Sequence, residues 1–119
     1  LSLLLREDRI AFTVEKGNIH IPLPNQFGVL QVGPLEGDDT IIGLVGSAWH
    51  THADQLLEYG GSSHAENIFR FLREIFTGRL LLIEETKQGG VVRRTIEDDL
   101  DSYLKYLPAD FEYRIFNKK

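Results

Sequence analysis

The sequence predicts a single α+β domain, built on an antiparallel or mixed sheet with about two helices. Three observations predict this fold class. Short runs of β-forming residues fill the first third, one long amphipathic helix pattern follows, and strand and helix patterns alternate towards the C-terminus. A chain of 119 residues fits one domain over 1–119, and 42% hydrophobic residues can supply its core.

A hairpin is predicted near the N-terminus. Residues 9–15 (RIAFTVE) are rich in β-formers, and Lys16-Gly17-Asn18 is a turn signal. Residues 19–23 should therefore return as the partner strand. Pro22 and Pro24 end that strand or mark it as an edge of the sheet.

The most apolar segment of the chain lies further on, at residues 40–49 (TIIGLVGSAW). It predicts a central strand, in which Gly43 and Gly46 indicate a bulge or a close backbone approach. A short strand at 28–32 precedes it, and residues 33–39 (GPLEGDD) join the two as a loop.

The pattern for a helix is clearest from His64 to Thr77. Ser63 and Glu66 form a capping box at its start, and Gly78 is a suitable C-cap. The apolar side chains fall on one face at helical spacing, which predicts an amphipathic helix packed on the sheet.

A second hairpin is predicted from strands at 79–87 and 91–96 around Gly89-Gly90. This turn would place Glu85 opposite Arg94, which indicates a cross-strand ion pair.

A second helix and a last strand complete the predicted order. The helix is expected from about Glu97 to Leu107, where Pro108 stops it. Residues 111–116 (FEYRIF) alternate and predict a strand.

The negative charge of the chain is concentrated near its C-terminus. Residues 97–112 hold six acidic residues and the single base Lys105, whereas the remaining chain carries twelve of each and the whole chain has net charge −5. This sign argues against a general nucleic-acid binder, and acids sharing one face would attract a basic partner. The alternative for Asp98, Asp99 and Asp101 is that acids in a first helical turn complement the helix dipole.

Several classes of chemistry lack their signatures. No apolar run approaches the length of a membrane span, and there is no cysteine for disulfides, thiolate metal sites or a thiol nucleophile. No phosphate-binding glycine loop and no Gly-x-Ser-x-Gly turn occurs. We therefore expect a cytoplasmic protein that binds rather than catalyses, without a cofactor.

The His-Thr-His triplet is the candidate metal site. On an extended backbone His50 and His52 present their imidazoles to one side, and imidazole is a good zinc ligand. Asp54 and His64 are candidates for a third ligand. The alternative is that both histidines hydrogen-bond to nearby backbone at a strand end.

Two segments around this triplet resemble the JAMM/MPN metalloprotease family. There a strand ends in His-x-His-Pro and Ser-x-x-Asp opens a helix; here Trp49-His50-Thr51-His52 and Ser63-His64-Ala65-Glu66 hold these places. Ala53 stands where that family has proline, and Glu66 where it has the metal-binding aspartate. Glu15 is a candidate position for its catalytic glutamate. The resemblance implies a zinc-dependent hydrolase.

Small size and local acidity also resemble bacterial immunity-type proteins, and the segments WHTHADQLLEYGG and GRLLLIEETKQGG look like small bacterial proteins of unknown function. The immunity resemblance implies a non-enzymatic protein that neutralises a basic, nuclease-like toxin. Its contact residues would be Glu97, Asp98, Asp99, Asp101 and Tyr106. A third alternative is a homo-oligomer that pairs through an edge strand such as 19–23.

Overall fold

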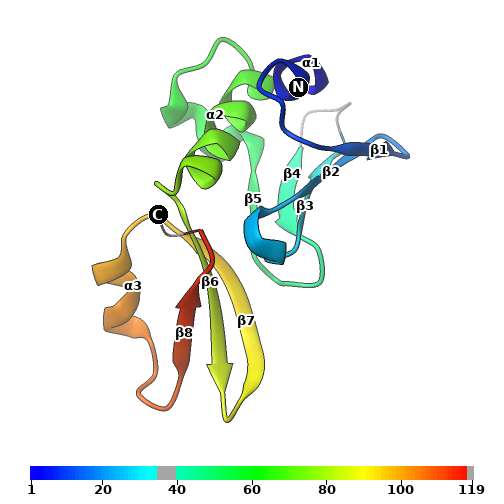
Figure 1. Cartoon of the computed structure of the whole chain (residues 1–119). Coiled ribbons are helices and arrows are strands. Elements are labelled where there is room, and N and C mark those ends of the chain that lie inside the picture. The colour runs from blue at the N-terminus through cyan, green and yellow to red at the C-terminus, as the bar shows by residue number, and fades with distance from the viewer. Residues whose placement is uncertain (35–39, 118–119) are drawn as a thin grey trace.

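The computed structural model of the chain describes residues 1–34 and 40–117, and it contains two antiparallel sheets with helices packed beside them (Figure 1). The predicted α+β fold class is confirmed. Most of the loop predicted at 33–39 lies outside the described residues. The helices are α1 (Ser2–Glu7), α2 (His64–Thr77) and α3 (Leu100–Tyr106), with 3-10 segments η1 (Pro24–Gln26) and η2 (Ala53–Tyr59).

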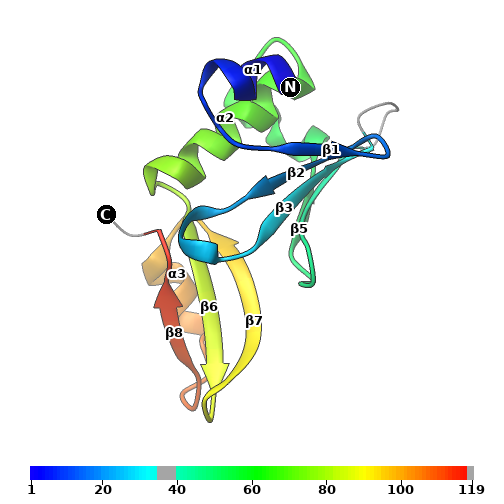
Figure 2. The ribbon, with the colours of Figure 1, turned by 45° about the vertical axis from the view of Figure 1, so that its right-hand side comes forward.

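The first sheet is a five-stranded antiparallel meander in the order β1-β2-β3-β4-β5. Figure 2 shows α1 and α2 lying on one side of its strands. The strands are β1 (Thr13–Glu15), β2 (Asn18–Pro22), β3 (Val29–Gly33), β4 (Ile41–Leu44) and β5 (His50–His52).

The second sheet has three antiparallel strands in the order β7-β6-β8, and α3 lies beside it (Figures 1 and 2). The strands are β6 (Leu81–Lys87), β7 (Gly90–Glu97) and β8 (Glu112–Ile115). The last of them confirms the strand predicted at 111–116.

One hydrophobic cluster joins the two sheets through α2. Leu30 and Ile42 of the first sheet, Leu72 and Ile75 of α2, and Leu82 of β6 all belong to it. Ile83 is buried outside this cluster, because successive residues of β6 point to opposite faces. The second face of the small sheet is the one that α3 covers.

The helix predicted at His64 to Thr77 is confirmed as α2. The Ser63 Oγ accepts a hydrogen bond from the Glu66 N–H at 3.2 Å, and Gly78 ends the helix with φ 83°. A left-handed C-cap of this kind favours glycine.

The apolar segment 40–49 is not one continuous strand, as predicted: only Ile41–Leu44 form a strand (β4), and β5 begins at His50, after the segment has ended. A turn at residues 45–47, with Gly46 at φ 79°, separates β4 from β5. Gly43 lies opposite His50, where an added Cβ would stand 3.6 Å from the His50 Cβ. The periodicity of the apolar run does not reveal this turn, because Val45 continues the run of apolar residues from β4 into the turn.

Of the two alternatives for the strand at 19–23, the end at Pro22 is confirmed, whereas the edge position is wrong. Its hydrogen-bonding edges are taken by β1 on one side and β3 on the other. The strand predicted at 9–15 shortens to β1, at Thr13–Glu15, and α1 at Ser2–Glu7 was not predicted.

The second hairpin turns one residue earlier than predicted. Gln88 and Gly89 form the turn with φ 54° and 80°, and Gly90 already belongs to β7. Two left-handed residues match the twist of a two-residue hairpin. A register shift beside Glu85 then places it opposite Arg93 instead of Arg94.

The predicted helix at Glu97 to Leu107 is shorter at its start. Glu97 ends β7, and Asp99 is the N-cap of α3, accepting a hydrogen bond from the Ser102 N–H at 3.2 Å. The extended backbone of β7 therefore continues into the acidic segment and delays the helix.

Asn117, which follows β8, forms hydrogen bonds to the segment between α2 and β6. Its side chain is buried; Nδ2 donates to the carbonyl oxygens of Ile75 at 2.9 Å and Leu80 at 2.6 Å. Its Oδ1 accepts from the Leu82 N–H at 2.8 Å. One side chain thus satisfies three backbone groups where three segments meet.

Candidate functional site

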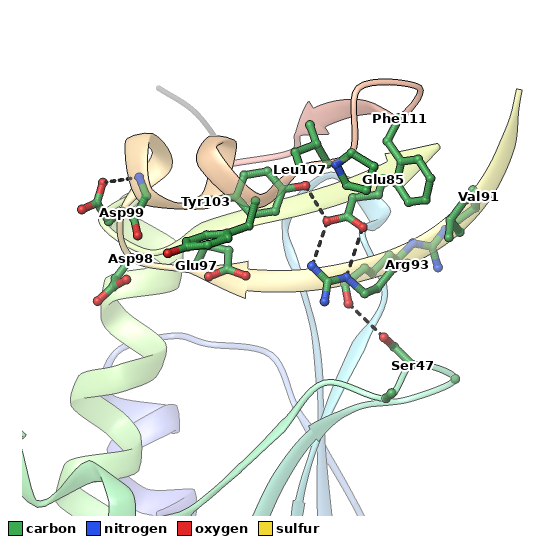
Figure 3. Close-up of a pocket in the computed structure, with 17 residues that line it drawn as sticks. Ser47, Glu85, Val91, Arg93, Glu97, Asp98, Asp99, Tyr103, Leu107 and Phe111 are labelled. Carbon is green, nitrogen blue, oxygen red and sulfur yellow. Dashed lines mark hydrogen bonds and ion pairs between the residues drawn. The ribbon is translucent and has the colours of Figure 1, made fainter. Parts of the chain in front are cut away.

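A cleft of about 820 Å³ lies between β7, α3 and the turn that joins β4 to β5 (Figure 3). Its size falls in the range of roughly 300–1,000 Å³ typical of ligand sites. Val91 and Phe111 lie towards one end in Figure 3, and Asp98 and Asp99 lie towards the other. The cleft therefore has an apolar end and an acidic end.

A buried carboxylate lies at the centre of this cleft. Glu85 of β6 is only 4% exposed and forms two hydrogen bonds with Arg93, from Nε to Oε1 at 3.2 Å and from Nη2 to Oε2 at 2.8 Å. The Tyr103 hydroxyl of α3 donates to Oε2 at 2.6 Å (Figure 3). The register of β6 and β7 brings Arg93 to this place.

The protonation of this group follows from its partners. Burial raises the pKa of Glu85, but the hydrogen bonds from Arg93 and Tyr103 outweigh it, so the pKa lies below its usual value. Burial, and then the hydrogen bond to Glu85, raises the pKa of Tyr103. Glu85 is thus an ionised, fully engaged carboxylate that fixes α3 against the sheet, and it is poorly suited to general acid–base catalysis near neutral pH.

The charges of the cleft do not balance. Arg93 is paired with Glu85, and the Arg94 Nε lies 3.0 Å from the Glu84 Oε2. Three further carboxylates line the cleft and make no ion pair within the part of the chain that the structure describes: Glu97, Asp98 and Asp99. Both arginines are neutralised from within, which leaves the acidic end with excess negative charge.

Exposed apolar side chains accompany this charge. Val91 and Val92 of β7 are 54% and 51% exposed, and Tyr106 of α3 is 84% exposed. All three line the cleft. Tyrosine with aliphatic side chains and a charged rim is a composition that suits an interface.

The structure brings together four of the five residues predicted to contact a partner. Glu97, Asp98, Asp99 and Tyr106 line the cleft, whereas Asp101 is exposed in the first turn of α3 outside its lining. Sequence reasoning missed the central residues, Glu85, Arg93 and Tyr103, as a group. The opposed charges of the hairpin were the available signal, but the predicted register paired Glu85 with Arg94.

The candidate metal ligands are not gathered into a site. The His50 and His52 rings lie 5.6 Å apart, and the His50 Nδ1 is 3.1 Å from the Ala48 carbonyl oxygen. Asp54 and His64 are exposed, in η2 and at the start of α2. Across residues 1–34 and 40–117, no group of three or more histidine, aspartate or glutamate side chains is placed to hold a metal ion.

Glu66, which stands at the metalloprotease-like position, has other partners. It accepts from the Ser62 hydroxyl at 2.7 Å and forms an ion pair with Arg70 at 2.5 Å. These bonds lower the pKa of Glu66, the bonds from Ser62 most strongly. Its contacts are those of a helix start, and Ser63 supplies the matching cap.

Comparison with protein-family models, with curated proteins and with solved structures gives no match for this chain. No helix among the described residues has the length and apolar character needed to cross a membrane.

Proposed function

We propose that this chain is a non-enzymatic binding protein whose cleft beside β7 and α3 receives a basic segment of a protein partner. One observation carries the proposal. The cleft exposes apolar side chains towards one end and, towards the other, three carboxylates that make no ion pair within the described residues. A partner with an apolar residue near a basic one would complement both ends.

The polar centre of the cleft supports binding over catalysis. The Glu85 oxygens are already held by Arg93 and Tyr103, so the group presents a rigid, preformed wall. Because a preorganised surface loses less conformational entropy on association, such a wall favours affinity.

The sign of the charge supports a basic partner. Acidic surfaces steer cationic partners and suppress acidic ones through like-charge repulsion. In its narrower form the proposal names an immunity-type role, in which the partner is a nuclease-like toxin domain. Such a domain carries basic side chains to bind phosphates, and an acidic cleft would compete for them.

The experiment is affinity capture with charge-reversed variants. Asp98→Lys with Asp101→Lys reverses two exposed acids that make no side-chain hydrogen bond or ion pair within the described part of the chain. A partner captured by the wild-type protein should bind this variant about tenfold or more weakly, since each exposed contact contributes up to about 1 kcal/mol and reversal adds repulsion.

The matched control is Glu7→Lys with Glu15→Lys. These exposed residues lie on α1 and β1, far from α3 in Figure 1, and their reversal changes the net charge by the same amount. We expect capture by the control to equal that of the wild type. If partner binding weakened equally in both variants, the effect would be one of net charge, and this result would contradict the proposal that the partner binds in the cleft.

A further inference from the structure

A second hollow of about 480 Å³ lies beside the cleft, between η2, α2, β5 and the end of β7. Three aromatic side chains line it. The Trp49 ring lies parallel to that of Phe71, with an interplanar angle of 5° and centroids 6.0 Å apart, and Tyr59 meets Phe71 edge-on at 6.4 Å. Phe71 is buried, and Trp49 and Tyr59 are half-buried, so part of their ring surface is open.

Carboxylates surround this aromatic group. Glu58, Glu74, Glu97 and Asp98 line the hollow, and none of them makes an ion pair within the residues that the structure describes. Glu97 and Asp98 also line the first cleft, so the two hollows share these side chains.

The electrostatic effect of these groups is visible at Tyr59. Burial, followed by the negative charges of Glu74, Glu58 and Asp98, raises the pKa of Tyr59 to about 12. Arg79 acts in the opposite direction and is the smallest of the named contributions. The hollow is thus a negative environment with aromatic walls and too little cationic charge of its own.

We propose that this aromatic, acidic hollow binds an arginine side chain of the protein partner. A guanidinium group is flat and weakly hydrated, so it can stack on aromatic rings while the N–H groups at its edge donate hydrogen bonds to carboxylates. Trp49 and Tyr59 supply rings, and Glu58, Glu74 and Asp98 supply carboxylates. The proposal rests on the proposed function only in that the basic partner would deliver the arginine.

The test uses the peptide N-acetyl-Gly-Arg-Gly-amide as the probe, without any partner. Trp49 is the only tryptophan of the chain, so its fluorescence and its indole N–H resonance report on this hollow alone. We expect a saturable change in both signals with the arginine peptide. The same peptide with citrulline, which keeps the shape and lacks the charge, should give no saturable change.

The variant Glu58→Gln with Glu74→Gln removes two charges that belong to this hollow and not to the first cleft. The dissociation constant of the arginine peptide should rise about tenfold, because two charge contacts are lost. Glu7→Gln with Glu15→Gln removes the same charge at a distance and should leave it unchanged. Each of three results would overturn the proposal: no saturable change, equal binding of citrulline, or lysine peptide binding as tight as arginine peptide.

The two proposals fail separately. If the peptide binds as expected but the Asp98→Lys, Asp101→Lys variant captures the partner as well as the wild type does, the arginine site in the hollow is supported and the partner site in the cleft is refuted. If capture depends on those acids but the peptide leaves Trp49 unchanged, the arginine site alone is refuted.

Discussion

Replacing Tyr103 with phenylalanine removes one hydroxyl from the centre of the cleft and leaves the ring in place. That hydroxyl donates at 2.6 Å to the ionised Glu85, and Tyr103 is 8% exposed. A hydrogen bond to a charged group contributes about 1.5–3 kcal/mol. Arg93 keeps its two hydrogen bonds to Glu85 in this variant, and water reaches the half-exposed Arg93 side chain. We therefore expect the free energy of unfolding to fall by about 2 kcal/mol, in the lower part of that range.

The assay is urea unfolding at neutral pH with thermal unfolding beside it. For a domain of this size the loss corresponds to a fall in Tm of about 8 °C. The control is Tyr106→Phe, on the same helix but 84% exposed, which should change stability by less than about 0.5 kcal/mol.

The pH dependence gives a second, independent readout. The folded-state pKa of Glu85 lies below its ordinary value. The contribution of the ionised Glu85 to folding stability is therefore complete above about pH 4.3 and is lost as the pH falls through the folded-state pKa. The difference between wild type and Tyr103→Phe should therefore shrink in acid. A Tyr103→Phe variant as stable as the wild type, or one whose deficit is the same at every pH, would refute the charged hydrogen-bond network.

Four further predictions follow from other contacts. Asn117→Ala leaves three backbone groups without their side-chain partner and should cost about 3 kcal/mol in urea unfolding. Gln88→Asn should raise stability by about 0.5 kcal/mol, because asparagine tolerates the left-handed φ of 54° better; an unchanged urea midpoint would count against this turn. Because the pKa of Tyr59 is raised, the contribution of Tyr59 to folding stability is complete below about pH 10 and is lost as the pH rises through about 12. An absorbance titration that compares the wild type with Tyr59→Phe follows the ionisation of this side chain. Zinc should not raise Tm, since no group of three ligands is assembled among the described residues; a stoichiometric stabilisation abolished by His50→Ala would contradict this.

Local signals predicted α2 best. Its apolar face, its Ser63 cap and its closing Gly78 are all encoded within sixteen consecutive residues, so the prediction needed no knowledge of distant contacts. The strand at 111–116 was predictable for the same reason.

Elements whose form depends on distant pairing were predicted less well. The apolar run at 40–49 contains a turn after β4, because β4 pairs with β3 on one side and with β5, which begins beyond the run, on the other. The second hairpin was displaced because Gln88 adopts a left-handed conformation that its residue type does not signal. The displaced turn, together with the register shift beside Glu85, changed the predicted neighbour of Glu85 from Arg94 to Arg93.

The candidate site divides in the same way. Its acidic residues are close in sequence, so the concentration of charge was visible at once. The hydrogen-bond network of Glu85, Arg93 and Tyr103 joins two strands and a helix. The aromatic, acidic hollow is lined by residues more than forty positions apart, from Trp49 to Asp98. Only tertiary packing brings such groups together.

The most direct test of the central claim is a map of the partner-binding surface by NMR. The captured partner is added to isotope-labelled protein, and backbone amide shifts are recorded for the whole chain. The account predicts that the shifted amides fall in β7, α3 and the turn between β4 and β5, with the Trp49 indole shifting at the same partner concentration. Shifts confined to α1 and β1, with the cleft unchanged, would contradict it.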